Sequence, residues 1–210
     1  MDLFEAMQTQ RSVRDYRDRD VSDEDVARIL EAASWAPNAG NRQLWEFIVV
    51  RDGGVKQALA EVYRESFDIL GKLISPGGPS ADARTHPRTM MKWSRNLADT
   101  LETVPVLIVI GYDRALSPFT AEGSIKAFAD ETVYTGVMPA VQNLMLAARA
   151  LGLGTCLTTA ANVLEGKTKA ILGVPEHIQL VALLPLGYPA HEFNAVSRIP
   201  VEEKVHHDRW

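Results

Sequence analysis

The chain has 210 residues, of which 46% are hydrophobic and 23% charged, and its net charge is -5 at pH 7. This composition is typical of one globular domain and argues against a basic surface for nucleic acid or anionic membranes. The single cysteine, Cys156, rules out an internal disulfide and fits a reducing compartment. The acidic start of the chain lacks a signal-peptide pattern, and apolar runs such as 104–110 are too short to span a bilayer. We therefore expect a cytoplasmic protein that binds neither nucleic acid nor membrane.

A short amphipathic segment opens the chain, and residues 10–16 follow it with two arginines and a serine in four positions. The planar guanidinium groups of Arg11 and Arg14 and the short hydroxyl of Ser12 are suited to binding a phosphate. The alternative is a solvated turn between two helices, because arginines are common at loop starts. The segment alone does not decide between these interpretations.

The first half of the chain has clear helix and loop signals. Ser22 is a good N-cap for a helix whose first turn is acidic, and apolar residues then recur at helical spacing until Pro37 ends the run. The pattern next predicts a loop at 37–43 and a strand at 44–50. A helix at 55–73 and a Gly/Pro-rich loop at 71–87 follow.

The second half is more regular. It predicts helices at 90–103, 126–151 and 162–172, strands at 105–112, 155–159 and 178–187, and an extended tail at 196–210. The helix at 126–151 is apolar around much of its circumference, so we expect it to be buried on several sides, in a core or at a subunit interface. Four strands interleaved with longer helices favour a single α+β domain of three layers over residues 1–210.

The chain has no recognisable catalytic side chains. It has no G-x-G-x-x-G or Walker sequence, no G-x-S-x-G turn, and no histidine or cysteine spacing typical of a zinc site. Cys156 lies in an apolar stretch, where a lone cysteine usually acts as a small hydrophobic residue. We therefore expect either pure binding or chemistry carried by a cofactor, with no metal site.

Four motifs occur in a characteristic order: Arg11-Ser12-x-Arg14, the loop and strand start at 36–45, the Gly-rich run at 152–155, and Arg198-x-Pro200. Together they resemble the FMN-dependent nitroreductase family over nearly the whole chain. This resemblance implies a nitroreductase-like sandwich, with a central, mostly antiparallel sheet flanked by helices. It also implies an intertwined homodimer with one FMN at each end of the subunit interface.

The resemblance gives FMN-binding roles to residues from several segments. They are Arg11, Ser12 and Arg14 for the phosphate, ribityl chain and pyrimidine edge, Arg198 for the phosphate, Asn96 for the pyrimidine ring, Thr158, Thr159 and Ala160 near flavin N5, and Asn38, Ala39, Asn41 and Gln43 of the partner subunit for the dimethylbenzene side. Segment 126–151 matches the central dimer helix. We expect 71–92 to form a substrate lid and 196–210 to form a C-terminal dimer arm.

The implied activity is an FMN oxidoreductase. NADPH or NADH would deliver hydride to flavin N5, and a nitroaromatic, a quinone or a similar small acceptor would then take the electrons in a ping-pong mechanism. One alternative is a flavin-binding or storage protein without NAD(P)H turnover. Another is an enzyme of the same family that destroys or rearranges its flavin, or that dehalogenates a phenol.

The chain departs from the family pattern at three positions. Leu44 stands where a proline is usual, and Gln10 replaces an arginine of many members, which predicts the loss of one phosphate donor. Asp99 replaces a common lysine. If Asp99 faces the pyrimidine edge, its charge disfavours the anionic reduced flavin and lowers the flavin potential.

Overall fold

A computed structural model describes residues 1–73, 87–116 and 125–210, apart from the side chains of 87–91 and 125–130. Its sheet has four strands, in the order β1 (Trp45–Val50), β2 (Val106–Asp113), β4 (Ile178–Gly187) and β3 (Gly154–Thr155). Each neighbouring pair is antiparallel, which confirms the expected sheet.

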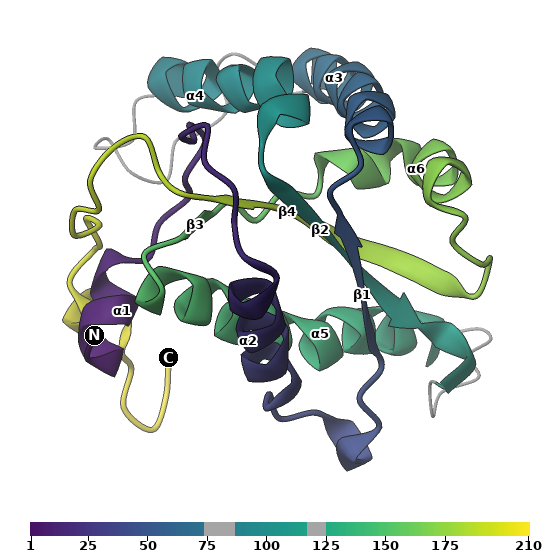
Figure 1. Cartoon of the computed structure of the whole chain (residues 1–210). Coiled ribbons are helices and arrows are strands. Elements are labelled where there is room, and N and C mark those ends of the chain that lie inside the picture. The colour runs from purple at the N-terminus through teal and green to yellow at the C-terminus, as the bar shows by residue number, and fades with distance from the viewer. Residues whose placement is uncertain (74–86, 117–124) are drawn as a thin grey trace.

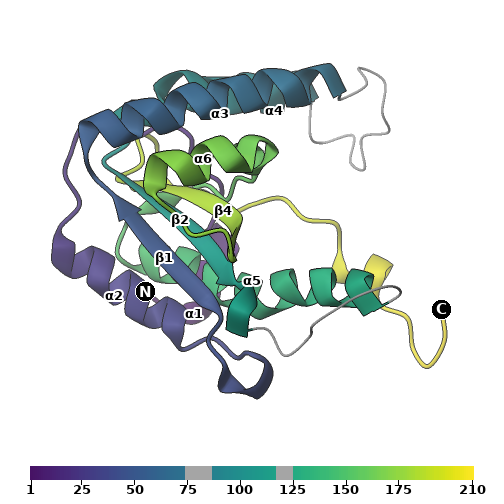
Figure 2. The same cartoon turned by 90° about the vertical axis from the view of Figure 1, so that its right-hand side faces the viewer.

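Helices cover both faces of this sheet. One face carries α2 (Asp23–Ser34) and α5 (Ile125–Ala150), and the other carries α3 (Gly53–Leu73), α4 (Pro87–Thr100) and α6 (Glu165–Leu172), as Figures 1 and 2 show. The short α1 (Leu3–Thr9) packs against α5. The predicted α+β domain of three layers is therefore confirmed.

Strand β2 shows why helices pack on both faces of the sheet. Its side chains point alternately to the two faces. Val106, Ile108 and Ile110 therefore join the core under α2 and α5, while Leu107 and Val109 join the core under α3 and α4. All five are at most 1% exposed, so this strand is buried on both faces and reads as a continuous apolar run.

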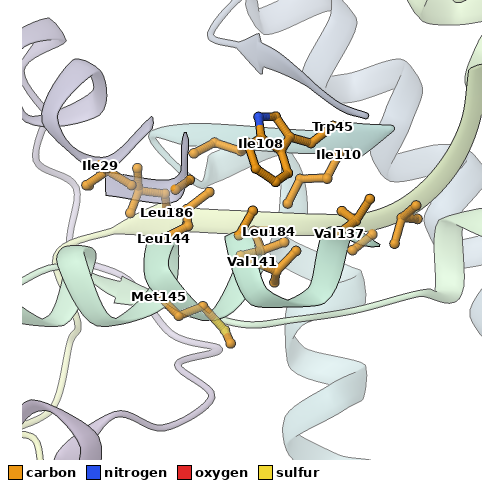
Figure 3. Packing of buried hydrophobic residues seen from close by; sticks show 14 of the residues in the cluster. Ile29, Trp45, Ile108, Ile110, Val137, Val141, Leu144, Met145, Leu184 and Leu186 are labelled. Atoms are coloured by element: carbon orange, nitrogen blue, oxygen red, sulfur yellow. The ribbon is translucent and has the colours of Figure 1, made fainter. Parts of the chain in front are cut away.

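The long helix α5 contributes much of one core. Val137, Val141 and Leu144 are at most 1% exposed and lie opposite Ile108 and Leu184 of the sheet (Figure 3). This packing accounts for the apolar face of α5 within one chain. Whether the rest of the helix meets a second subunit stays a prediction.

Most predicted boundaries agree with the structure. Ser22 is the N-cap of α2, and its Oγ accepts a hydrogen bond from the Asp25 amide at 3.0 Å. Helix α4 begins at Pro87, a favoured residue in the first turn because it lacks an amide hydrogen. Residues 74–86, the greater part of the expected lid, lie outside the described residues.

The strand predicted at 155–159 is wrong in its extent. Only Gly154 and Thr155 pair as a strand, and Thr158 exchanges a separate pair of backbone hydrogen bonds with Leu183, at 2.9 and 3.1 Å. The chain then turns into a short 3-10 helix at Ala160–Leu164, which ends the pairing. The three threonines within residues 155–159 suggested a longer strand than this turn permits.

The tail at 196–210 is extended, as expected, apart from a short 3-10 helix at Val201–Lys204, and it leaves the body of the molecule (Figure 2). Within the described ranges, no helix has both the length and the apolar character needed to cross a membrane.

Candidate functional site

Backbone pairing holds the N-terminal segment 12–17 between two parts of the sheet. The Val13 amide donates to the Thr155 carbonyl of β3 at 2.8 Å, and the Ala190 amide, after β4, donates to the Asp15 carbonyl at 3.0 Å. Ser12 and Arg14 therefore project from a segment with a fixed backbone, and Arg11 comes directly before it.

Close packing at Gly154 makes this arrangement possible. A Cβ at position 154 would lie 2.6 Å from Val13 Cγ2 and 2.8 Å from Val13 Cβ, closer than real side chains approach. Only glycine lets segment 12–17 lie this near β3. The requirement is steric, since no positive φ is involved.

A pocket of about 210 Å³ opens over this segment. One wall is the N-terminal segment, with Arg11, Ser12, Val13, Arg14 and Asp15. The other is the segment after β4, with Pro189, His191, Glu192, Phe193 and Asn194, and α4 contributes Trp93. Three of the predicted site residues, Arg11, Ser12 and Arg14, thus lie together in one concavity.

In this pocket Asp15 has a salt-bridge partner among the described residues, whereas Arg11 and Arg14 have none. Asp15 Oδ2 is 3.2 Å from His191 Nε2, and the rings of His191 and Trp93 lie nearly perpendicular with centroids 6.2 Å apart. Among the described residues, no carboxylate lies within 4 Å of the guanidinium of Arg11 or Arg14. The two cations are therefore available to an anionic ligand.

Three titratable groups lie within this segment or near it: Tyr16, Tyr63 and Cys156. Burial raises the pKa of Cys156, against the lowering effects of the Arg14 charge and a hydrogen bond from Ser12. Burial also raises the pKa of Tyr16, well above its ordinary value, and of Tyr63. All three groups therefore stay neutral at pH 7, and the Cys156 thiol is a poor nucleophile.

We expect the free energy of unfolding to fall as the pH rises above about 8.5, where thiols begin to ionise in an unfolded chain, and further above about 10, where tyrosines do. The folded pKa values lie above these, so the unfolded state releases protons that the folded state keeps. Urea unfolding between pH 7 and 11 measures the effect. Cys156→Ala with Tyr63→Phe should flatten the slope, and an unchanged slope in this variant would contradict the assignment.

Asn96 and Thr158 make contacts within the protein near the site. The Asn96 side chain donates to the Arg14 carbonyl at 3.2 Å, so it holds the backbone of segment 12–17. Thr158 Oγ1 lies 2.8 Å from the Tyr63 hydroxyl and accepts from the Ala160 amide at 3.3 Å, which orders the turn at 158–160. The roles of Asn96, Thr158, Thr159 and Ala160 toward a flavin stay predictions.

The loop with Asn38, Ala39, Asn41 and Gln43 does not line this pocket within one chain. It lies between α2 and β1, at the bottom of Figure 1, where Asn38 Oδ1 accepts from the Gln43 amide at 2.8 Å. Gly40, Asn41 and Gln43 have positive φ values of 63°, 50° and 53°, so the loop has a defined shape. Its expected role in a partner's site stays a prediction.

Arg198 also does not line this pocket within one chain. It is exposed, donates to the neighbouring Ser197 carbonyl at 2.9 Å, and lines a shallow hollow with Phe4, Met7, Gln8 and Val196. One chain alone therefore does not bring Arg198 into the pocket with Arg11, Ser12 and Arg14.

Two departures from the family pattern now have a structural account. The Gln10 side chain turns to α5 and donates to Met145 Sδ at 3.6 Å, so it does not line the pocket. Asp99 pairs with Arg95 at 3.0 Å on the exposed side of α4. This ion pair offsets the negative charge on which the expected effect of Asp99 depended.

Sequence reasoning missed the wall at 189–194. No motif of the sequence gave this segment a role, and it lies about 180 positions from Arg11 in the chain. The Gly187-Tyr188-Pro189 run, which ends a buried strand, was the available signal, since loops that follow strands often carry function.

Comparison with known proteins identifies the family. The model of the nitroreductase family matches residues 7–188. A protein of Archaeoglobus fulgidus, provisionally named NADH dehydrogenase/NAD(P)H nitroreductase, is 31% identical over 96% of this chain and 95% of its own length. An NADH dehydrogenase of Thermus thermophilus is 30% identical, over 98% and 95%. The chain therefore belongs to the nitroreductase family.

Solved structures agree with this fold. An iodotyrosine deiodinase bound to FMN and 3-iodo-L-tyrosine superposes with a TM-score of 0.74 at 20% identity, and the match covers 100% of both chains. At this identity, the likeness concerns the fold.

Proposed function

We propose that the chain binds FMN in the pocket formed by 11–15 and 189–194 and acts as an NAD(P)H-dependent oxidoreductase. The observation that carries the proposal is the presence of Arg11, Ser12 and Arg14 in one pocket, with both guanidiniums free of carboxylate partners within the described residues. FMN has a terminal phosphate, and paired guanidiniums with a hydroxyl match its geometry and charge. Membership of the nitroreductase family supports the same cofactor.

The residues that line the pocket fit this cofactor. Arg11 and Ser12 would hold the phosphate, and Arg14 would reach toward the ring. The backbone bonds of Val13 to Thr155 and of Asp15 to Ala190 would keep these side chains in place. The pocket is open on one side, and we propose that a second copy of the chain completes it with Asn38, Ala39, Asn41 and Gln43. Arg198 and the tail would then act across the subunit interface.

The flavin supplies the redox chemistry, accepting hydride at N5 and passing electrons to an acceptor. The chain binds and orients both reactants, and Asn96 and Tyr63 keep the arginine segment and the 158–160 turn in place. No described side chain is assigned a proton-transfer role. The acceptor would be a nitroaromatic, a quinone or a similarly small molecule.

Anaerobic addition of NADPH, then NADH, to the FMN-loaded protein tests this function. We expect the oxidised flavin bands to bleach and to return when a nitroaromatic or a quinone is added. Bands that persist with both nucleotides would contradict the reductase and support a flavin-binding protein without turnover. Bleaching that only a halogenated phenol reverses would contradict the proposed acceptors.

A further inference from the structure

A single guanidinium behind the pocket touches the N-terminal segment and the segment after β4. Arg149, in the last turn of α5, is only 9% exposed. Its Nε donates to Thr9 Oγ1 at 2.9 Å, and its Cζ lies 4.0 Å from the centre of the Phe193 ring. Thr9 comes two residues before Arg11, and Phe193 is part of the pocket wall, whereas Arg149 is not.

Helix α5 also holds the next residue of the N-terminal segment. Met145, which accepts the hydrogen bond from Gln10, lies four residues before Arg149 and therefore on the same side of the helix. Thr9 and Gln10 thus both attach to the last two turns of α5. The segment is tied to α5 just before the pocket and to β3 within it.

Arg149 has no carboxylate partner within 4 Å among the described residues. A buried cation is costly unless other groups compensate it. Here the carbonyl end of α5, the face of Phe193 and the Thr9 hydroxyl do so. These contacts favour a guanidinium over an ammonium group, because Nε donates to Thr9 Oγ1 while Cζ lies over the Phe193 ring.

We propose that Arg149 is a positioning residue, which sets the distance between the arginine-bearing segment and the wall at 189–194. The inference rests on the proposed FMN site. A pocket with fixed walls binds its ligand without first having to order them, so the loss of Arg149 weakens binding although Arg149 touches no ligand.

The test is the dissociation constant of FMN and of riboflavin, which lacks the phosphate, measured by flavin fluorescence on the full chain. Arg149→Met, Arg149→Lys and Phe193→Leu should each weaken the binding of both flavins about tenfold. Arg149→Met combined with Phe193→Leu should cost little more than either change alone, because both remove one contact. Arg17→Met, an exposed charge on the same segment and outside the pocket, is the control.

Other results would overturn the proposal. Weakening confined to FMN would make Arg149 a direct phosphate ligand, and unchanged affinities would leave it a stabiliser of the fold only. Thermal unfolding of the flavin-free variants separates a general loss of stability from a change in the pocket. If Arg149→Met does not fold, Thr9→Val still decides, because it removes the acceptor of Arg149 Nε while Arg149 keeps its charge and Thr9 does not line the pocket. Failure of the unaltered chain to bind FMN would instead refute the proposed function.

Discussion

Replacing Arg11 with methionine is expected to weaken FMN binding by about 10- to 100-fold. A hydrogen bond between charged groups is worth about 1.5–3 kcal/mol, and about 1.4 kcal/mol corresponds to tenfold in affinity. Arg11 lines the pocket with Ser12, and among the described residues no acid holds its guanidinium. A fluorescence titration of FMN measures the change, and riboflavin affinity should fall much less.

Arg17→Met is the matched control for Arg11→Met. It removes the same charge from the same segment, but Arg17 is exposed and does not line the pocket. If both variants weakened FMN binding equally, the effect would be one of overall charge, and the phosphate site would have to be placed elsewhere. A second check is ionic strength, since loss of a direct contact should persist at high salt.

Replacing Gly154 with alanine is expected to lower the free energy of unfolding by about 1–3 kcal/mol, the usual cost of overpacking a buried site. The added methyl group would lie 2.6–2.9 Å from three atoms of Val13, so segment 12–17 has to move away from β3. The same movement shifts Ser12 and Arg14, and FMN affinity should fall with stability. Urea unfolding and FMN titration measure the two effects.

Gly166→Ala is the control for this prediction. Gly166 lies in α6, and a Cβ there meets nothing within 4 Å, so this change should be neutral or slightly stabilising. Val13→Ala removes the two methyl groups involved in the clash and should partly restore the Gly154→Ala variant. If Gly154→Ala were as stable as Gly166→Ala, the close approach of segment 12–17 to β3 would be wrong.

Much of the fold follows from local patterns. The continuous apolar run of β2 required burial on both faces, and Ser22, followed by acids, marked the start of α2. The end of β3 could not be predicted, because threonines favour strands locally and the turn at 158–160 depends on Tyr63, far away in the sequence.

The site was only partly predictable for a similar reason. The arginine motif was visible in the sequence, and the structure gathers Arg11, Ser12 and Arg14 in one pocket. The opposite wall and the link through Arg149 depend on tertiary contacts between segments more than 40 residues apart, which no local pattern reveals. The residues expected to act across a subunit interface also do not line this pocket in a single chain. They are Asn38, Ala39, Asn41, Gln43 and Arg198.

The most direct test of the account is the visible spectrum of the purified protein, followed by addition of FMN to protein from which any flavin has been stripped. We expect the two absorption bands of an oxidised flavin, or stoichiometric uptake of added FMN, with binding weakened in Arg11→Met and retained in Arg17→Met. A colourless protein that takes up no FMN would contradict the proposed cofactor, and with it both the oxidoreductase function and the role of Arg149.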